Sequence, residues 1–459
     1  MRELFGTDGI RGVAGKRPLD PATIYKLGKA IVRSGRRKVL IGRDTRISGP
    51  WIARVLEQAI RDEGGEVTVA DVITTPAVAI LCRHEPFDAG IVVSASHNPF
   101  QDNGIKIISK GGMKLTDEEE EWIEQSVAGD SDEDSLPQIT EQPRPQEIRG
   151  FNRKLVDNYV DFLRTVPSVD SLRPLKVVLD CAHGAAFHIA VRIFEELGAE
   201  VVALNINPDG RNINQGCGAV YPEKMAQKVI ETKASLGVAL DGDADRAIFC
   251  DENGKLFDGD YVLYILARFF QRMGQLKSQC VVTTVMANKG LEFALERADL
   301  RIVRTRVGDR YVLARMLQGN HALGGEPSGH IIMSAHSLAG DGIVTALKIV
   351  DVMIQEGRSL EELAEGFRKF PQVLLNVRVR EKVDFSKIPA IQQEIEAAET
   401  RMGETGRVLI RYSGTEQLAR IMLEGEKKEQ IIHHGQAIAA RFEEKLGVGE
   451  DCGPLTPDP

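Results

Sequence analysis

Ser96 is the residue of this sequence whose surroundings best suit a reactive hydroxyl. It stands in the run SASHNP, directly after the apolar stretch Ala89–Val93. A serine that ends a buried strand, on a turn enforced by Asn-Pro, projects its hydroxyl where the sheet opens. Because a bare serine is a weak nucleophile, it needs a base, a metal ion or prior conversion to a phosphoester. The run lacks the GxSxG order of an esterase, and read alone it predicts only a polar turn.

Asp241, Asp243 and Asp245 alternate in the run DGDADR, which follows the apolar stretch 236–240. Three carboxylates on one tight loop repel one another unless a cation lies between them. Hard oxygen ligands in this number suit Mg²⁺, which often takes its remaining ligands from water or phosphate. The loop therefore predicts a magnesium site, with the adjoining Arg246 placed to bind a phosphate; the alternative is a solvated acidic turn.

Two glycine-rich segments carry polar groups of the kind that bind a sugar. The run GGEPSGH places Glu326 and Ser328 between glycines, where both can hydrogen-bond sugar hydroxyls, and His330 closes the run. Near the start of the chain, FGTDGIRG places Arg11 on a glycine-rich turn. Each segment alone predicts no more than a polar loop.

A fourth run, RYSGTE, lies between the apolar stretches 408–410 and 419–423. Its guanidinium, hydroxyls and backbone N–H groups can cradle a phosphate in one turn. The order differs from the GxxxxGK[ST] of a P-loop, so the run is not one. The candidate phosphate-binding residues are Arg411, Ser413, Gly414 and Thr415.

The bulk composition excludes several classes of protein. The 459-residue chain has a formal net charge of −9, and no block of Lys and Arg stands out, which argues against a nucleic-acid partner. The six cysteines form no CxxC pair, so neither a metal knuckle nor a dense disulfide framework is expected. The N-terminus has no apolar signal-peptide core, and no apolar stretch is long enough to span a bilayer. We therefore expect a cytoplasmic protein with no membrane partner.

The elements that must position these runs show a repeated pattern. Three segments read as strand, polar turn, amphipathic helix and second strand, which predicts mixed or parallel sheets covered on both faces. We interpret them as three related α/β domains, although any α/β protein repeats this pattern. In each segment the ranges are strand, helix and second strand. The first segment comprises residues 38–41, 51–61 and 66–69. The second comprises 176–179, 189–197 and 200–204, and the third comprises 281–284, 291–298 and 300–303.

The domain boundaries follow from composition and turn signals. Residues 129–149, rich in Asp, Glu, Pro, Ser and Gln, predict a solvated connection, and the turn at 251–254 predicts a second break. After residue 371 the pattern predicts a strand, a helix, two strands and a long helix, which together form a smaller α+β domain. The expected domains are residues 1–150, 151–252, 253–369 and 370–447, followed by a disordered tail at 448–459.

Taken together, the runs FGTDGIRG, SASHNP, DGDADR, GGEPSGH and RYSGTE resemble the α-D-phosphohexomutase superfamily, in order and over essentially the whole chain. The resemblance implies three α/β domains with mixed sheets and a smaller C-terminal domain, arranged like a heart around a central cleft. Pro327 stands where Gln or Met is usual, which stiffens the sugar loop and removes one backbone donor. In the RYSGTE run and the residue after it, Tyr412 stands where Pro or Lys is commoner, and Gln417 stands where Pro is commoner.

The resemblance also implies a mechanism. Ser96 would carry a phosphoryl group in the resting enzyme, and one Mg²⁺ per chain would be held by Asp241, Asp243, Asp245 and a phosphoserine oxygen. A substrate hydroxyl would take the phosphoryl group, and the resulting 1,6-bisphosphohexose would turn around and return its other phosphate to Ser96. Glucosamine 1,6-bisphosphate or a related bisphosphohexose is the implied activator. The implied substrate-binding set is Arg246, Glu326, Ser328, Arg411, Ser413, Gly414 and Thr415.

The base that takes the proton of the attacking hydroxyl is left open between Lys106 and His330, with Arg11 beside the serine. Lys106 would need a lowered pKa in this role. The cationic neighbours Arg11 and Arg246 are expected to lower it.

Residues 5–12, 212–219 and 307–312 resemble the branch of the superfamily that interconverts glucosamine 6-phosphate and glucosamine 1-phosphate, and a homodimer is expected by resemblance. The alternative inside the superfamily is an enzyme that acts on glucose and mannose phosphates. These sugars differ only around C2, where a single polar contact gives about 1–3 kcal/mol. A metal-dependent phosphatase is a weaker alternative: the same site would hydrolyse a phosphoester if water reached the phosphoserine, and release of inorganic phosphate would distinguish it. A non-catalytic sugar-phosphate sensor is another, and the intact Ser96, acidic loop and Lys106 argue against it.

Overall fold

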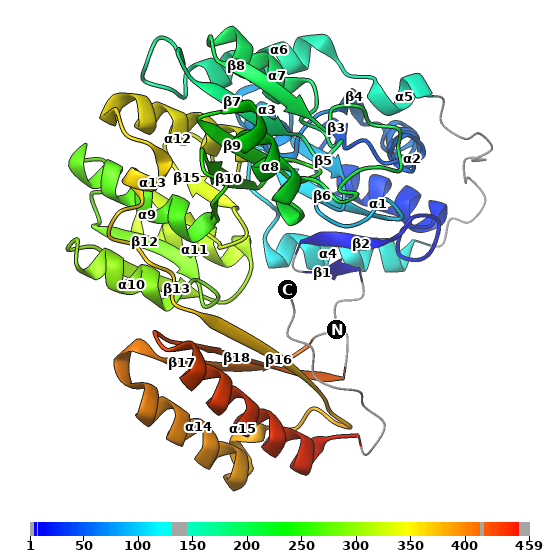
Figure 1. Cartoon of the computed structure of the whole chain (residues 1–459). Coiled ribbons are helices and arrows are strands. Elements are labelled where there is room, and N and C mark those ends of the chain that lie inside the picture. Colours follow the sequence, from blue (N-terminus) through cyan, green and yellow to red (C-terminus); the bar gives the residue numbers. More distant parts are fainter. Residues whose placement is uncertain (1–3, 7, 131–144, 414–416, 449–459) are drawn as a thin grey trace. The chain divides into compact units, whose positions relative to one another are not determined.

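The computed structural model describes residues 4–6, 8–130, 145–413 and 417–448 (Figure 1). By its internal contacts the chain divides into two compact units. The first comprises Met1–Met286 with Arg301–Glu365, and the second comprises Ala287–Leu300 with Gly366–Pro459. The first unit holds three sheets and the second holds one.

The first sheet carries the serine run. Its strands β3, β4 and β5 are parallel, whereas β2 and β6 join antiparallel, in the order β1-β2-β6-β5-β3-β4. Ile41 and Ile91 pack with helices α1 and α2 in one core, while α3 packs against β3, β5 and β6. Strands buried on both faces read as unbroken apolar runs, which is why the sequence marks them clearly. The elements are β1 (Phe5–Gly6), β2 (Gly9–Val13), α1 (Pro21–Arg33), β3 (Lys38–Arg43), α2 (Gly49–Asp62), β4 (Glu66–Val72), α3 (Thr75–His84), β5 (Ala89–Val93), β6 (Asp102–Ser109) and α4 (Asp117–Gly129).

The second sheet carries the acidic run, in the order β11-β10-β9-β7-β8. Strands β7, β8 and β9 are parallel, and β10 and β11 continue antiparallel. The turn at 251–254 joins β10 to β11, so the sheet continues past this turn signal to Phe257. The elements are α5 (Pro145–Arg149), α6 (Arg153–Arg164), β7 (Lys176–Asp180), α7 (Ile189–Glu196), β8 (Glu200–Leu204), η1 (Gly218–Val220), α8 (Glu223–Thr232), β9 (Leu236–Leu240), β10 (Ala247–Asp251) and β11 (Leu256–Phe257).

The third sheet has the order β13-β12-β14-β15, with β14 and β15 forming an antiparallel pair around the sugar run. Helix α10 follows β12 in the chain, as predicted, but by its contacts it belongs to the second unit. There the Lys289 backbone N–H donates to Glu424 Oε1 over 2.9 Å. The elements are α9 (Gly259–Arg272), β12 (Cys280–Thr284), α10 (Lys289–Glu296), β13 (Arg301–Thr305), α11 (Asp309–Gly319), β14 (Leu323–Gly325), β15 (Ile331–Met333), α12 (Gly342–Glu356) and α13 (Leu360–Leu363).

The second unit holds a three-stranded antiparallel sheet in the order β16-β18-β17, with α14 and α15 packed on it (Figure 1, orange and red). The predicted succession of strand, helix, two strands and long helix is confirmed, and with it the predicted class of three α/β domains followed by a smaller α+β domain. Residues 131–144 and 449–459 lie outside the described residues, so the predicted solvated connection and tail are described only at their edges. The elements are β16 (Gln372–Arg378), η2 (Phe385–Lys387), α14 (Pro389–Met402), η3 (Gly403–Thr405), β17 (Arg407–Tyr412), β18 (Leu418–Glu424) and α15 (Lys428–Leu446).

Among the described residues, no helix combines the length and apolar character that crossing a membrane requires.

Candidate active site

Ser96 lies in the loop after β5, and its side chain is directed at the acidic run of the second sheet. The residue is fully buried and has a φ of 51°, the left-handed conformation that non-glycine residues rarely adopt. Its hydroxyl donates to Asp241 Oδ2 over 2.6 Å and lies 3.2 Å from His97 Nδ1. The structure therefore brings together the hydroxyl and the carboxylates that the sequence separates by 145 positions.

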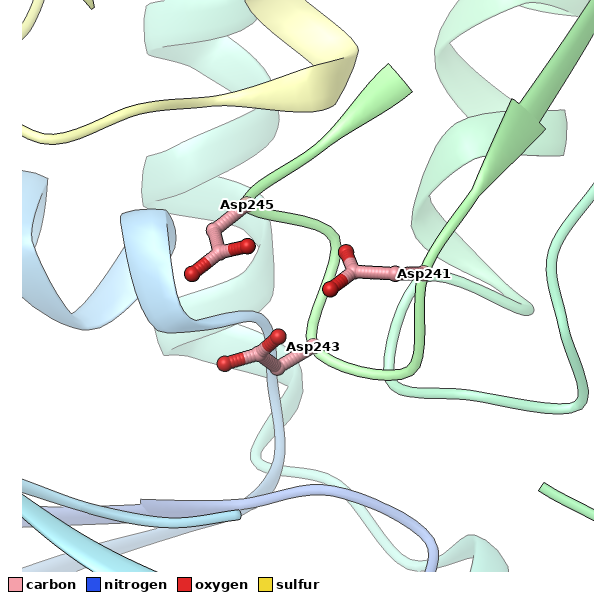
Figure 2. A group of neighbouring side chains, drawn as sticks. All are labelled: Asp241, Asp243 and Asp245. Carbon is pink, nitrogen blue, oxygen red and sulfur yellow. The ribbon is translucent and has the colours of Figure 1, made fainter. Parts of the chain in front are cut away.

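The three carboxylates of the acidic run converge from the loop between β9 and β10 (Figure 2). One ligand oxygen from each of Asp241, Asp243 and Asp245 lies within 4.8 Å of the other two, and all three residues are buried. Burial and the charges of Asp245 and Asp243 raise the pKa of Asp241 well above its usual range. Thr75, at the start of α3, donates its hydroxyl to Asp243 Oδ2 over 2.6 Å.

Two buried oxygens of these carboxylates lack hydrogen-bond partners, as is expected where a divalent cation would bind. Asp243 Oδ1 and Asp245 Oδ1 are buried and have no hydrogen-bond partner among the described residues. Buried acceptors of this kind cost free energy unless something pairs with them. Three convergent carboxylates with a hydroxyl alongside are the hard oxygen donors that Mg²⁺ prefers.

The surroundings of Lys106 contradict the expectation that its pKa is lowered. Its ammonium group is buried and lies 3.0 Å from Asp243 Oδ2, 3.3 Å from Asp245 Oδ2 and 3.3 Å from Asp8 Oδ2. Burial alone would lower the pKa of Lys106, but the attraction of these three carboxylates outweighs it and raises the pKa well above the usual value. The predicted lowering by neighbouring arginines is therefore wrong for this arrangement, because the carboxylates lie closer and outnumber them.

Arg11 lies over the serine loop from strand β2. Its guanidinium donates to Ala95 O over 3.3 Å and to Asn98 Oδ1 over 3.2 Å, and it is paired with Asp8. Burial together with the charges of Arg246 and Arg11 lowers the pKa of His97 to about 4. His97 is therefore a neutral imidazole at neutral pH, with its Nδ1 beside the Ser96 hydroxyl oxygen.

His330 lies at the end of the sugar run, next to the acidic run. Its Nδ1 is 3.8 Å from Asp245 Oδ1 and its Nε2 is 3.6 Å from Asp309 Oδ2. Burial would lower the pKa of His330, but Asp245, Asp309 and Glu326 raise it above the usual value. The Gly340 N–H donates to Nε2 over 3.2 Å, so in this structure Nε2 offers its lone pair and Nδ1 can hold a proton.

The sugar run folds so that Glu326 and Ser328 keep hydrogen-bonding capacity. Glu326 Oε1 accepts from the Gly308 N–H over 3.1 Å, whereas the Ser328 hydroxyl is buried with no partner among the described residues. The start of helix α9 and the loop pack closely, because a Cβ on Gly259 would lie 2.0 Å from the Glu326 carbonyl oxygen. Arg246 Nε is also buried and without a hydrogen-bond partner there, 3.7 Å from Asp245 Oδ1.

A cavity of about 580 Å³ in the first unit joins these groups. Its walls come from segments next to all three sheets of that unit. The charged and imidazole residues that line it are Asp8, Arg11, His97, Asp245, Arg246, Asp309, Glu326 and His330. A pocket with both cationic and anionic walls suits a substrate that carries phosphate and several hydrogen-bonding groups.

The predicted phosphate cradle lies in the second unit, which is described by itself. Arg411 is exposed near the end of β17, and Ser413 is buried, with its carbonyl oxygen accepting from Lys382 Nζ over 2.7 Å. Gly414 and Thr415 lie outside the described residues. The cradle residues therefore stay a prediction.

Comparison with known proteins identifies the family. Models of the phosphoglucomutase/phosphomannomutase family match in order: alpha/beta/alpha domain I at residues 2–134, domain II at 157–254, domain III at 258–370 and the C-terminal domain at 374–441. The phosphoglucosamine mutase of Anaeromyxobacter sp. (strain Fw109-5) is 45% identical, covering 97% of this chain and 96% of its own. That of Geotalea daltonii is 46% identical over 97% and 99% of the two chains. This chain belongs to the phosphoglucosamine mutase family.

Solved structures agree with this assignment at the level of the fold. A phosphoglucomutase/phosphomannomutase family protein from Burkholderia thailandensis superimposes with a TM-score of 0.76 at 22% identity, covering 96% of this chain and 97% of its own. An Aspergillus fumigatus N-acetylphosphoglucosamine mutase, solved with GlcNAc-6P and magnesium, gives a TM-score of 0.66 at 18% identity, covering 96% of each chain. The membership expected from the five runs is confirmed.

Three residues at the site of this family member were not predicted. Lys114 Nζ lies 2.7 Å from Asp309 Oδ2 and also contacts Asp8, and it thereby links the first sheet's domain to helix α11. Lys106, Lys114 and Arg11 outweigh the effect of burial and lower the pKa of Asp8 well below its usual range. Asp8 and Asp309 lie in runs that the sequence analysis considered, so these two carboxylates could have been recognised as candidate site residues. Lys114 carried no such signal.

Gly242 lies where the acidic run approaches the serine loop closely. A Cβ at this position would lie 2.5 Å from the Ser96 carbonyl oxygen, so Gly242→Ala must displace one loop. We expect Gly242→Ala to destabilise the protein by about 1–3 kcal/mol and to lower mutase activity by about 10-fold or more. Thermal unfolding and steady-state rates measure the two effects. Gly129→Ala, where nothing lies within 4 Å of the new Cβ, is the matched control and should change neither; equal behaviour of the two variants would refute the close approach.

Proposed function

We propose that this protein is a phosphoglucosamine mutase that interconverts glucosamine 6-phosphate and glucosamine 1-phosphate through a phosphoserine at Ser96. The observation that carries the proposal is the 2.6 Å contact between the Ser96 hydroxyl and Asp241 of the convergent acidic run. A phosphoryl group on this oxygen would lie directly at three carboxylates that fit a divalent cation. Full-length relatives named phosphoglucosamine mutase support the choice of substrate.

The proposed reaction transfers one phosphoryl group in each of two steps. The C1 hydroxyl oxygen of glucosamine 6-phosphate attacks the phosphorus, and the bond between phosphorus and the Ser96 oxygen breaks. The hydroxyl proton passes by way of a base to the leaving Ser96 oxygen. The enzyme-bound 1,6-bisphosphate then turns around, and the Ser96 hydroxyl oxygen attacks the phosphorus of its 6-phosphoryl group. The bond between that phosphorus and the C6 oxygen breaks, the proton of Ser96 passes by way of the base to the C6 oxygen, and glucosamine 1-phosphate leaves. Asp241, Asp243, Asp245 and a phosphoserine oxygen would hold one Mg²⁺, which neutralises charge on the phosphoryl oxygens.

The base is proposed to be Lys106 or His330, each lying within reach of the acidic run. Two of the three carboxylates that keep Lys106 protonated, Asp243 and Asp245, are also proposed to bind Mg²⁺. Added positive charge there weakens the attraction that raises the pKa of Lys106. Arg11, beside the serine loop, would stabilise the transferring phosphoryl group.

Recognition of the rest of the substrate is divided between two loops in this proposal. Glu326 and Ser328 bind sugar hydroxyls that look alike in both orientations of the bisphosphate, and Ser328 has its hydroxyl unsatisfied. The phosphate that is not reacting is bound by the guanidinium and turn of the RYSGTE run. Arg246, beside the acidic run, binds a phosphate at the metal site. The cradle residues are Arg411, Ser413, Gly414 and Thr415.

The proposal includes the setting in which the enzyme works. We place it in the cytoplasm, as a homodimer by resemblance to the superfamily, with a bisphosphohexose such as glucosamine 1,6-bisphosphate as activator. A dimer would give twice the chain mass of 50.5 kDa by light scattering.

A comparison of substrates on one preparation tests the function. We expect glucosamine 6-phosphate to give a higher kcat/KM than glucose 1-phosphate or mannose 1-phosphate in coupled assays, with little inorganic phosphate released and no turnover in EDTA. Activity on glucose and mannose phosphates is the second candidate, because the family models carry those names. A wide deficit for glucosamine 6-phosphate would favour that candidate, and stoichiometric phosphate release would favour a phosphatase.

A further inference from the structure

Two side chains outside the proposed catalytic set hold the serine loop by its carbonyl oxygens. Arg46 comes from the segment between β3 and α2 of the first sheet, and Asn214 comes from the segment between β8 and η1 of the second. Both are buried, and neither is among the residues that line the active-site cavity. They approach the same two carbonyl oxygens, those of Ser96 and Asn98.

Arg46 has no solvent exposure, and its guanidinium donates to four carbonyl oxygens of the serine loop and its continuation. Its Nη2 donates to Ser96 O over 2.9 Å and to Asn98 O over 2.8 Å, and its Nη1 donates to Asp102 O over 3.0 Å and to Pro99 O. The charge is balanced by Asp44, whose Oδ2 lies 2.8 Å from Arg46 Nε.

Asp44 links this ion pair back to the loop. Its Oδ2 accepts from the Ser94 hydroxyl over 2.6 Å, and the Ser94 hydroxyl oxygen in turn accepts from the Ser96 N–H over 2.9 Å. The peptide groups on both sides of Ser96 are therefore tied to one buried ion pair. Buried networks in which every member is satisfied are rigid.

Asn214 supplies the second set of donors from the other domain. Its Nδ2 donates to Ser96 O over 2.8 Å and to Asn98 O over 3.0 Å, and its own N–H donates to Ala182 O over 2.9 Å. Each of the two carbonyl oxygens thus receives two donors, which fills both of its lone-pair directions. Ser96 has a left-handed backbone, a conformation that persists only where the surroundings over-determine it.

We propose that Asn214 and Arg46 are positioning residues that fix the orientation of the Ser96 oxygen for phosphoryl transfer. This inference rests on the proposed function. Because transfer requires the donor and acceptor atoms in line, a small rotation of the Ser96 peptide lowers the chemical rate. The substrate contacts lie elsewhere, so binding of glucosamine 6-phosphate should be unaffected.

Asn214→Asp tests the inference with little change in volume. It replaces the two N–H donors with a carboxylate oxygen that faces two carbonyl oxygens and repels them. We expect kcat, and the single-turnover rate of discharge of phosphorylated enzyme by glucosamine 6-phosphate, to fall by about 10- to 100-fold. KM should stay within about twofold, because the binding residues are untouched.

Asn212→Asp is the matched control in the same segment. Asn212 donates to Asn207 O over 3.0 Å, is half-buried, and has no hydrogen bond to the described part of the serine loop, so the kcat of this variant should stay near the wild-type value. Asn214→Ala, which removes the donors without adding charge, should slow discharge less than Asn214→Asp does. Arg46→Lys should also lower kcat, and thermal unfolding of each variant reports whether it is folded.

The outcomes separate this inference from the proposed function. If folded Asn214→Asp discharges its phosphoserine as fast as Asn212→Asp, or if only KM changes, the positioning role is refuted. If the wild-type enzyme does not convert glucosamine 6-phosphate but does convert glucose 1-phosphate, the proposed substrate is wrong. In that case the same comparison of kcat and KM with glucose 1-phosphate decides the positioning role.

Discussion

Ser96→Ala should lower kcat for glucosamine 6-phosphate by on the order of 10⁴- to 10⁶-fold, because it removes the oxygen that carries the phosphoryl group between the two sugar positions. No other hydroxyl among the described residues is hydrogen-bonded to Asp241. The fold should survive, since the substitution deletes one polar atom from a loop whose carbonyl oxygens remain bonded. Steady-state assay and thermal unfolding measure the two expectations.

Ser171→Ala is the control for this prediction. Its hydroxyl donates to Leu197 O in the second sheet's domain, away from the acidic run, and its loss should leave turnover within about twofold. A folded Ser96→Ala enzyme with near-normal turnover would show that another group carries the phosphoryl group.

Asp241→Asn has the second largest expected effect, and it acts in opposite directions on activity and stability. It removes one carboxylate from the proposed Mg²⁺ site, so we expect kcat to fall by at least about 100-fold and Mg²⁺ affinity to fall with it. In the metal-free protein the same change removes repulsion from Asp243 and Asp245, which together with burial raises the pKa of Asp241. We therefore expect the Tm in EDTA at neutral pH to rise, by about 1–3 °C.

The expected rise in Tm follows from how the stability of the metal-free protein depends on pH. A carboxyl group whose pKa is raised on folding stabilises the folded protein below its unfolded pKa, and that stability is lost as the pH rises through the folded pKa. Metal-free wild-type protein should therefore lose stability as the pH rises through the raised pKa of Asp241, and Asp241→Asn should lose less. Titration calorimetry with Mg²⁺ and melts at several pH values measure both effects.

Asp170→Asn, an exposed aspartate in the second domain, is the control and should change neither Mg²⁺ affinity nor Tm. Unchanged Mg²⁺ binding by Asp241→Asn would remove this carboxylate from the metal site. A lower Tm in EDTA would show that the hydrogen bond from Ser96 outweighs the repulsion.

Much of the fold could be predicted because buried strands leave continuous apolar runs. The stretch before Ser96 and the stretch before Asp241 both proved to be strands with all residues buried, β5 and β9. The meeting of Ser96 and Asp241 was expected from the resemblance to the superfamily, which places a phosphoserine oxygen and the acidic run on one Mg²⁺. Helix α10 shows the limit: its place in the chain was predicted, but the unit it packs with depends on tertiary contacts.

The electrostatics of the site could be predicted less well. From the sequence, Arg11 and Arg246 were expected as cationic neighbours of Lys106. The sequence did not show that Asp8, Asp243 and Asp245 surround the Lys106 ammonium group. The role of Asn214 was also hidden, because an amide that donates to two carbonyl oxygens of a distant loop leaves no local pattern. Such contacts depend on distances between elements that composition and periodicity do not encode.

The central claim is tested most directly by locating the phosphoryl group during turnover. Enzyme loaded with glucose 1,6-bisphosphate and digested for tandem mass spectrometry should carry one phosphoryl group, on Ser96. In rapid-quench experiments, adding glucosamine 6-phosphate with Mg²⁺ should discharge it at a rate no slower than kcat, with glucosamine 1,6-bisphosphate as the first product. A phosphoryl group on any other residue, or a Ser96 phosphate that persists unchanged while many turnovers are completed, would contradict the account.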